Sequence, residues 1–174
     1  MIILLTGPTG AGKTDTSWEL IKQFDSLVFL DCDWFASMKP FSWNKQSDVE
    51  LVYAAIANTI MFHTQNQKNN FVITLTIQMA QKYHFFKSYF DEFELPIHTF
   101  RLTCSLEELK RRISLRDRLE SQKNQEYEDT RVQQQLFEKL FLGNAEFKKI
   151  DNTMLSEEET ARIIKDNVCH QTAS

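Results

Sequence analysis

The chain has 174 residues, of which 42% are hydrophobic and 25% charged, so it is long enough to bury a core and is expected to form one domain, 1–174. Its net charge of −4 argues against a general nucleic-acid binder, which would be basic. Three widely spaced cysteines fit neither a disulfide framework nor a zinc pattern, no apolar run is long enough to span a membrane, and no basic leader is visible, so we expect a cytoplasmic protein.

The first predicted elements are a strand, a glycine loop and a helix. The apolar run Ile2–Thr6 is followed by the pattern G-x-x-x-x-G-K-[ST], the Walker A motif or P-loop, and then by a helical pattern from Asp15 to Phe24. Such a loop binds phosphates with backbone N–H groups at a helix N-terminus, while its lysine reaches the β- and γ-phosphates and its hydroxyl binds Mg²⁺. We therefore predict a nucleoside triphosphate site; a chance glycine-rich turn is the structural alternative. The residues of the motif are Gly7, Pro8, Thr9, Gly10, Ala11, Gly12, Lys13 and Thr14.

A second apolar run, Leu27–Leu30, predicts a buried parallel strand that ends at Asp31-Cys32-Asp33. Carboxylates at the C-terminal end of such a strand lie on the ligand side of an open α/β sheet. Extended backbone would direct Asp31 and Asp33 to the same side. One of the two carboxylates could then lie in the coordination shell of Mg²⁺, and the other could accept a proton from a substrate hydroxyl. A polar turn, or a helix cap formed by Asp33, is the alternative.

Residues 34–44 have an irregular pattern and many aromatic side chains. These aromatics suit either stacking on a flat acceptor substrate or a small core under a cover. A long amphipathic helix is predicted next, from Ser47 to Thr64, and Ser47 with Glu50 matches a capping box at its start.

The second half of the chain predicts strands and helices in alternation. Threonines Thr74 and Thr76 stand at the end of the third strand, where an acidic residue would be expected in a P-loop protein. The polar segment 120–129 indicates a mobile cover, and Gly143 is expected to end the helix that follows it. Strands are predicted over 71–75, 97–104 and 147–150. Helices are predicted over 77–93 and 130–142. Two more helices are predicted to begin at capping boxes, one at Ser105 and one at Ser156, the latter ending at Val168.

Arg112 and Arg116 lie four residues apart on the helix that starts at Ser105, so they share a face. An arginine there can fold over the phosphates and stabilise a transferring phosphoryl group. Ion pairs four residues apart, Glu108 with Arg112 among them, are the alternative explanation for these charges.

The alternation of strands and helices predicts an α/β fold with a doubly wound, mostly parallel sheet and right-handed crossovers. With its P-loop, its D-x-D at Asp31 and Asp33 and its arginines before a polar cover, nearly the whole chain resembles the small P-loop kinases of the nucleoside monophosphate kinase-like group. Shikimate kinase, gluconate kinase and chloramphenicol phosphotransferase belong to that group.

The resemblance implies a P-loop NTPase fold with five strands in the order 2-3-1-4-5 and a helical lid. It also implies ATP and Mg²⁺ as cofactors, with Lys13 on the phosphates, Thr14 and Asp31 on the metal and Asp33 as the base. Arg112 and Arg116 would belong to the lid, residues 112–130, and residues 34–68 would bind the acceptor. Asp151 and Asn152 would belong to the loop around the nucleotide base.

Two departures from the group bear on the acceptor. No arginine occurs between Lys13 and Arg101, although anionic acceptors are usually clamped by arginine. Thr76-Ile77-Gln78 stands where shikimate kinases carry three glycines. We therefore expect a neutral or cationic acceptor, such as a nucleoside or an antibiotic, and disfavour shikimate and monophosphates.

Two other functions remain open from the sequence. A kinase for the 5′-hydroxyl of a nucleic acid shares the D-x-D plan, although the acidic chain speaks against the basic groove it needs. A nucleotide-binding switch or ATPase without a small acceptor would fit the missing acid after the third strand. The sequence leaves monomer and dimer equally open.

Overall fold

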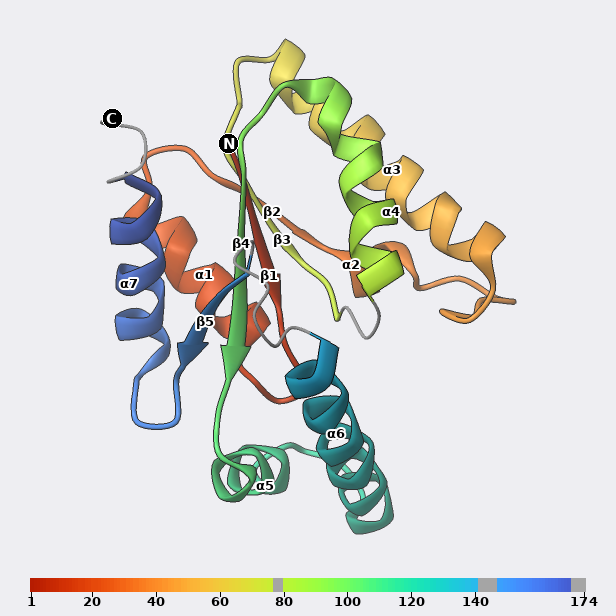
Figure 1. The fold of residues 1–174 in the computed structure, drawn as a ribbon, viewed down its shortest axis with the longest axis vertical. Helices are drawn as coiled ribbons and strands as arrows, with labels where there is room; N and C mark the ends of the chain where they lie inside the picture. The colour runs from red at the N-terminus through yellow and green to blue at the C-terminus, as the bar shows by residue number, and fades with distance from the viewer. Residues whose placement is uncertain (77–79, 141–146, 170–174) are drawn as a thin grey trace.

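In the computed structural model, which describes residues 1–76, 80–140 and 147–169, five parallel strands form one sheet in the order β2-β3-β1-β4-β5 (Figure 1). This confirms the predicted α/β fold and its strand order. The strands are β1 (Ile2–Thr6), β2 (Val28–Asp31), β3 (Phe71–Thr74), β4 (Ile97–Thr103) and β5 (Phe147–Asp151). The helices are α1 (Lys13–Gln23), α2 (Cys32–Phe35), α3 (Gln46–Gln65), α4 (Ala80–Phe90), the 3-10 helix η1 (Asp91–Phe93), α5 (Leu106–Ser114), α6 (Glu120–Leu140) and α7 (Glu157–Cys169).

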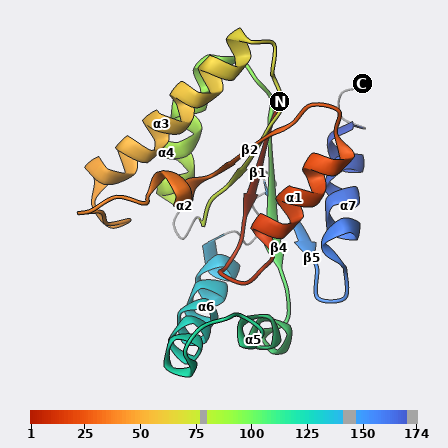
Figure 2. The ribbon, with the colours of Figure 1, turned by 180° about the vertical axis from the view of Figure 1, so that it is seen from behind.

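Helices cover both faces of the sheet, as an all-parallel sheet requires. Helices α3 and α4 lie on one face, and α1 and α7 lie on the other (Figures 1 and 2). The central strand β1 supplies both cores, because successive side chains point to opposite faces. Ile2 and Leu4 pack in the core with α3 and α4, whereas Ile3 and Leu5 pack in the core with α1 and α7.

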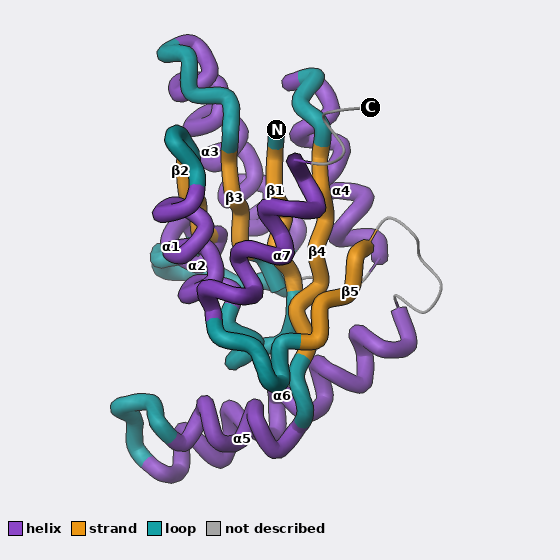
Figure 3. Tube along the Cα trace, turned by 90° about the vertical axis from the view of Figure 1, so that its left-hand side faces the viewer, coloured by secondary structure: helices purple, strands orange, loops and turns teal. Residues whose placement is uncertain are grey.

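Helices α5 and α6 form a separate pair at the C-terminal ends of the strands (Figures 1 and 3). A buried arginine of β4, Arg101, attaches α6 to the sheet. Its guanidinium donates to the backbone oxygen of Phe137 at 2.9 Å and to the carboxylate of Glu138 at 3.0 Å. The pair is therefore fixed over the edge at which the ligand site of an open α/β sheet forms.

The main error in the predicted elements concerns residues 120–129, which were not predicted to be helical but form the start of α6. Helix α6 begins at Glu120 and continues through the predicted start at residue 130. The segment lacks the apolar stripe that announces a helix, but its polar side chains bond to their surroundings. Lys123 donates to the backbone oxygen of Ser114 at 2.9 Å, and Gln125 donates to Asp129 one turn later at 2.9 Å.

Helix ends were predicted with mixed success. The caps at Ser105 and Ser156 are confirmed: Ser105 accepts from the backbone N–H of Glu108 at 3.2 Å, and Ser156 accepts from that of Glu159 at 3.1 Å. The prediction that Ser47 caps the next helix is wrong, because α3 begins at Gln46 and Lys45 is its N-cap. The predicted cap at Gly143 and residues 77–79 of the helix predicted over 77–93 lie outside the described residues.

Replacing Gly7 by alanine is expected to destabilise the fold by roughly 2–4 kcal/mol. Gly7 has a φ of 151°, and a Cβ there would lie 2.5 Å from the backbone oxygen of Leu102, which belongs to a buried strand. Gly10→Ala is the matched control, because a Cβ at Gly10 would meet only flexible side chains, at 3.4 Å or more. Its left-handed φ of 83° should lower the free energy of unfolding by only about 1 kcal/mol when alanine replaces the glycine. Urea unfolding of both variants measures the difference; an equal loss for the two would contradict this explanation.

Candidate active site

The P-loop forms one wall of a cavity of about 730 Å³ at the C-terminal edge of the sheet. Gly12 is the N-cap of α1 and has a left-handed φ of 85°, a conformation that glycine adopts without strain. The other walls are the ends of β2 and β3, the arginines of α5 and the turn at residues 155–157. The structure thus brings the predicted phosphate loop, carboxylates and lid arginines to one place.

Lys13 is held inside the loop. Its ammonium group donates to the backbone oxygens of Gly7 at 2.9 Å and Pro8 at 3.1 Å. The pKa of Lys13 is lowered to about 8, mainly by burial and to a smaller extent by the nearby charge of Arg116, while the carboxylates of Asp33 and Asp31 oppose the shift. A half-buried cation whose hydrogen bonds to described residues all go to carbonyl oxygens is suited to bind an incoming anion.

Thr14 and Asp31 are hydrogen-bonded to each other, so they lie close enough to bind the same metal ion. The hydroxyl of Thr14 donates to one carboxylate oxygen of Asp31 at 3.2 Å, and the other oxygen accepts from the backbone N–H of Asp33 at 3.0 Å. Both side chains offer hard oxygen ligands of the kind that Mg²⁺ prefers. No cluster of three or more acidic, histidine or cysteine ligands occurs within the described ranges, so Mg²⁺ would need phosphate oxygens to complete its shell. The donor set fits a metal that arrives with a nucleotide.

Asp33 lines the cavity, but the argument from extended backbone that predicted this was wrong. The chain turns after Asp31 into the short helix α2, and Asp31, not Asp33, caps that helix. The Asp33 residue as a whole is exposed to solvent, but the walls of the cavity partly desolvate its carboxylate. This desolvation raises the pKa of Asp33, and the Asp31 carboxylate raises it further, while Lys13 acts against the shift.

A smaller pocket of about 260 Å³ shares four lining residues with the large cavity: Thr9, Asp33, Leu75 and Thr76. The rest of its described lining comes from the region predicted to bind the acceptor and from α6, namely Trp43, Asn44, Tyr53 and Gln133. Asp33 therefore lies where the two spaces meet, and it is the one charged residue in the described lining of the smaller pocket.

Arg112 takes part in the predicted ion pair and also reaches the P-loop. Its Nε donates to Glu108 at 2.7 Å, and one terminal nitrogen donates to the backbone oxygen of Asn152 at 3.0 Å. The other terminal nitrogen lies 3.4 Å from the position that a Cβ on Gly12 would occupy. The guanidinium is therefore placed against the N-terminus of α1, where bound phosphates would lie.

Arg116 and Arg118 share a partner on α6. Because α5 ends at Ser114, the prediction that Arg116 lies on that helix is wrong, and Arg116 stands just after it. Both guanidinium groups pair with the carboxylate of Glu126, at 2.8 Å for Arg118. All three side chains line the large cavity. In the absence of phosphate, Glu126 supplies the negative charge that these arginines face.

Asp151 and Asn152 stand at the end of β5, and neither belongs to the described lining of the large cavity. The buried side chain of Asn152 donates to the backbone oxygen of Ala11 at 2.9 Å, which ties the loop to the end of β5. Asp151 is exposed and accepts from the hydroxyl of Thr153 at 2.6 Å. The cavity wall on this side is formed by Leu155, Ser156 and Glu157, so a contact of Asp151 or Asn152 with the nucleotide base stays a prediction.

A sequence profile of the AAA domain family matches residues 2–140. The chain belongs to this family. No curated protein matches it, whereas many solved structures do.

The solved structures show which fold this AAA domain has. The tunicamycin resistance protein of Deinococcus radiodurans matches with a TM-score of 0.68 and 16% identity, over 96% of this chain and 94% of that one. Shikimate kinase from Acinetobacter baumannii matches with a TM-score of 0.65 and 17% identity, over 99% and 95%. A sugar kinase from Janibacter sp. HTCC2649 matches with a TM-score of 0.59 and 15% identity, over 96% and 91%. The resemblance to the small P-loop kinases is thereby confirmed at the level of the fold. Among the described residues, no helix combines the length and apolar character needed to cross a membrane.

Sequence reasoning missed the residues that α6 contributes to the site of this AAA domain. Gln133 lines the smaller pocket, and its side-chain oxygen accepts from the backbone N–H of Thr9 at 3.0 Å across 124 residues of chain. Glu126 was included only as part of a polar cover. No local pattern marks either residue, because their roles depend on how α6 is placed over the sheet.

The affinity of the P-loop for ATP is expected to fall as the pH rises above about 8, the pKa of Lys13. The protonated amine binds phosphate, so the affinity should fall by up to about tenfold per pH unit beyond that point. Lys13→Arg is the control, because an arginine stays charged over this range and its affinity should remain nearly flat. Titration with a fluorescent ATP analogue from pH 7 to 10 measures both; a flat wild-type profile would contradict the role given to Lys13.

Proposed function

We propose that this protein is an ATP-dependent, Mg²⁺-assisted kinase that transfers the γ-phosphoryl group to a hydroxyl of a small neutral or cationic molecule. The observation that carries the proposal is the place of Asp33, at the junction of a cavity walled by the P-loop and a smaller pocket walled by residues of the predicted acceptor region. A base must lie between the two substrates of such a transfer, because it takes a proton from one as the other reacts.

Each group of the large cavity has a task in this reaction. The backbone of the P-loop and Lys13 bind the phosphates, and Thr14 with Asp31 would hold Mg²⁺, which neutralises phosphate charge when bound. Asp33 accepts the proton of the acceptor hydroxyl as the hydroxyl oxygen bonds to the γ-phosphorus and ADP leaves. Its raised pKa makes the carboxylate a stronger base than that of an ordinary aspartate.

Arg112 of α5, with Arg116 and Arg118 just after that helix, supplies positive charge where the phosphoryl group transfers. Arg112 already lies against the N-terminus of α1. Arg116 and Arg118 can turn from Glu126 to phosphate oxygens, which carry more charge than one carboxylate. This exchange would close α5 and α6 over the nucleotide and exclude water from the reaction.

The pocket beside Asp33 supports a small neutral or cationic acceptor. Its described lining carries no arginine or lysine, so it offers an anionic group no charged partner. A nucleic-acid strand would need a longer, basic groove, which a pocket of about 260 Å³ beside an aspartate does not provide.

The test is ADP release from Mg-ATP with a panel of acceptors: nucleosides and their monophosphates, sugars and sugar acids, aminoglycosides, chloramphenicol, and oligonucleotides with a 5′-hydroxyl. The proposal expects turnover that depends on a neutral or cationic small molecule. Preference for a monophosphate or a sugar acid would overturn the acceptor class, and preference for the oligonucleotides would favour the nucleic-acid kinase. Slow ATP hydrolysis that no acceptor changes would favour a nucleotide-binding switch.

A further inference from the structure

One polar side chain connects the acceptor pocket with the P-loop backbone. Gln133 of α6 is half-buried, lines the smaller pocket and accepts from the N–H of Thr9 at 3.0 Å. Thr9 lines the smaller pocket and the large cavity alike. The side chain of Gln133 therefore lies at the same junction as Asp33, on a different element.

The contact with Thr9 fixes which half of the Gln133 amide faces the pocket. A backbone N–H can only donate, so the oxygen of the side chain must be the atom that faces Thr9. The Nε2 group is left with two N–H donors, and no described residue accepts from them. The amide is thus fixed through its oxygen, while its two N–H donors remain available. Such an amide is suited to bind an oxygen atom of a ligand.

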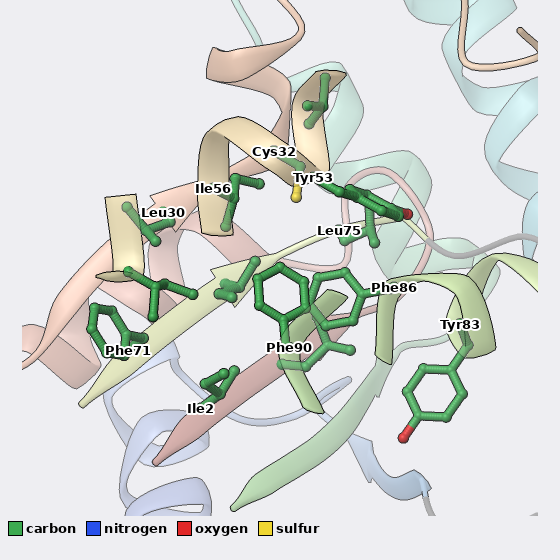
Figure 4. Close-up of a cluster of buried hydrophobic side chains, with 14 of the residues drawn as sticks. Ile2, Leu30, Cys32, Tyr53, Ile56, Phe71, Leu75, Tyr83, Phe86 and Phe90 are labelled. Carbon is green, nitrogen blue, oxygen red and sulfur yellow. The ribbon is translucent and has the colours of Figure 1, made fainter. Parts of the chain in front are cut away.

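The other described walls of the pocket are also uncharged, apart from Asp33. Tyr53 belongs to the core between α3 and the sheet, and it lies next to Leu75 at the edge of that core (Figure 4). No described partner bonds to its hydroxyl, which can donate into the pocket from the side of α3. The described lining of the pocket thus offers neutral donors and no cation, and its one charged group, the carboxylate of Asp33, repels anions. A hydroxyl, carbonyl or amide oxygen is therefore favoured there over a carboxylate or phosphate.

We propose that Gln133 positions the acceptor through an uncharged oxygen: Nε2 binds a hydroxyl, carbonyl or amide oxygen of the acceptor, while Oε1 ties the Gln133 side chain to the P-loop at Thr9. The inference rests on the proposed kinase function, and it adds that the acceptor carries such an oxygen, and no anionic group, at Gln133. It makes Gln133 a positioning residue, because the chemical step itself belongs to Asp33.

Gln133→Met tests the positioning role, because methionine keeps the length and helix propensity of glutamine but removes both polar atoms. The matched control is Gln135→Met, on the same helix but exposed and outside the acceptor pocket. With the best acceptor of the panel, kcat/KM for the acceptor should fall at least about tenfold, or about 1.4 kcal/mol, in Gln133→Met only. The affinity for a fluorescent ATP analogue, measured without acceptor, should change less than about threefold.

Two outcomes overturn the inference while the kinase function stands. One is an acceptor kcat/KM in Gln133→Met within about twofold of wild type. The other is an equal loss of ATP affinity, which would make Gln133 only a support for the P-loop. Wild-type protein without acceptor-dependent turnover is a different failure, and it overturns the proposed function together with this inference.

A second variant tests the restriction against anionic acceptors. Gln133→Arg places a cation in the pocket, so it should raise the ratio of kcat/KM for an anionic acceptor over its neutral counterpart by at least about tenfold. Uridine 5′-monophosphate against uridine and gluconate against glucose are the matched pairs, with Gln135→Arg as the control. An unchanged ratio in both pairs would overturn the restriction.

Discussion

Lys13→Ala is expected to weaken the binding of Mg-ATP by about a hundredfold. The ammonium group of Lys13 is held within the P-loop by two backbone oxygens and lies beside the cavity that would receive the phosphates. A hydrogen bond to a charged group is worth about 1.5–3 kcal/mol, and removal of the cation leaves the phosphate charge without this partner. Calorimetric titration with a non-hydrolysable ATP analogue measures the change.

Lys22→Ala is the control for that experiment. Lys22 lies at the other end of α1, exposed to solvent, where it pairs with Glu19. Its loss removes the same charge from the same helix without touching the cavity, and ATP affinity should stay within about twofold, since exposed pairs contribute little. Equal affinities for wild type and Lys13→Ala would show that the phosphates bind elsewhere.

Asp33→Asn is expected to lower kcat by about a hundredfold to ten thousandfold while ATP affinity is retained. Asparagine keeps the shape of the side chain but cannot accept the hydroxyl proton. The raised pKa of Asp33 adds a second expectation: the wild-type rate should rise with pH until Asp33 has lost its proton, because only the carboxylate is a base. The variant should lack this rise.

Asp25→Asn is the matched control for Asp33→Asn, because Asp25 is exposed and lies before β2, whereas Asp33 follows that strand. Turnover with the best acceptor, measured over a range of pH, compares the three proteins. A normal kcat in Asp33→Asn would remove Asp33 as the base, although the nucleotide site would remain. Loss of ATP affinity in the same variant would instead place Asp33 in the metal or phosphate shell.

The strands and the phosphate loop could be predicted because local sequence patterns mark both, whereas the strand order came from the resemblance to the small P-loop kinases. The apolar runs of β1, β2 and β3 mark strands buried on both faces, and the glycines of the P-loop mark backbone that other residues cannot adopt. Asp31 and Asp33 were placed correctly at the ligand edge by the position of β2. The geometry between them was wrong, because a helix that starts at Cys32 leaves no apolar repeat to announce it.

What could not be predicted depends on contacts between distant parts of the chain. The first turns of α6 carry no apolar stripe, and their polar side chains bond to α5 and the loop before α6. Gln133 reaches Thr9 only because Arg101 fixes α6 over the sheet. Both facts follow from tertiary packing, which overrides local propensity and leaves no mark in a short stretch of sequence.

The central claim, that the γ-phosphoryl group passes to a hydroxyl of a small molecule, is tested most directly by following γ-labelled ATP. Wild-type protein and Asp33→Asn would be incubated with Mg-ATP and the best acceptor of the panel, and the labelled products separated. We predict that wild type places the label on the acceptor and that Asp33→Asn does so at least about a hundredfold more slowly. Label that appears only as inorganic phosphate, at the same rate with and without acceptor, would contradict the kinase function and leave an ATPase.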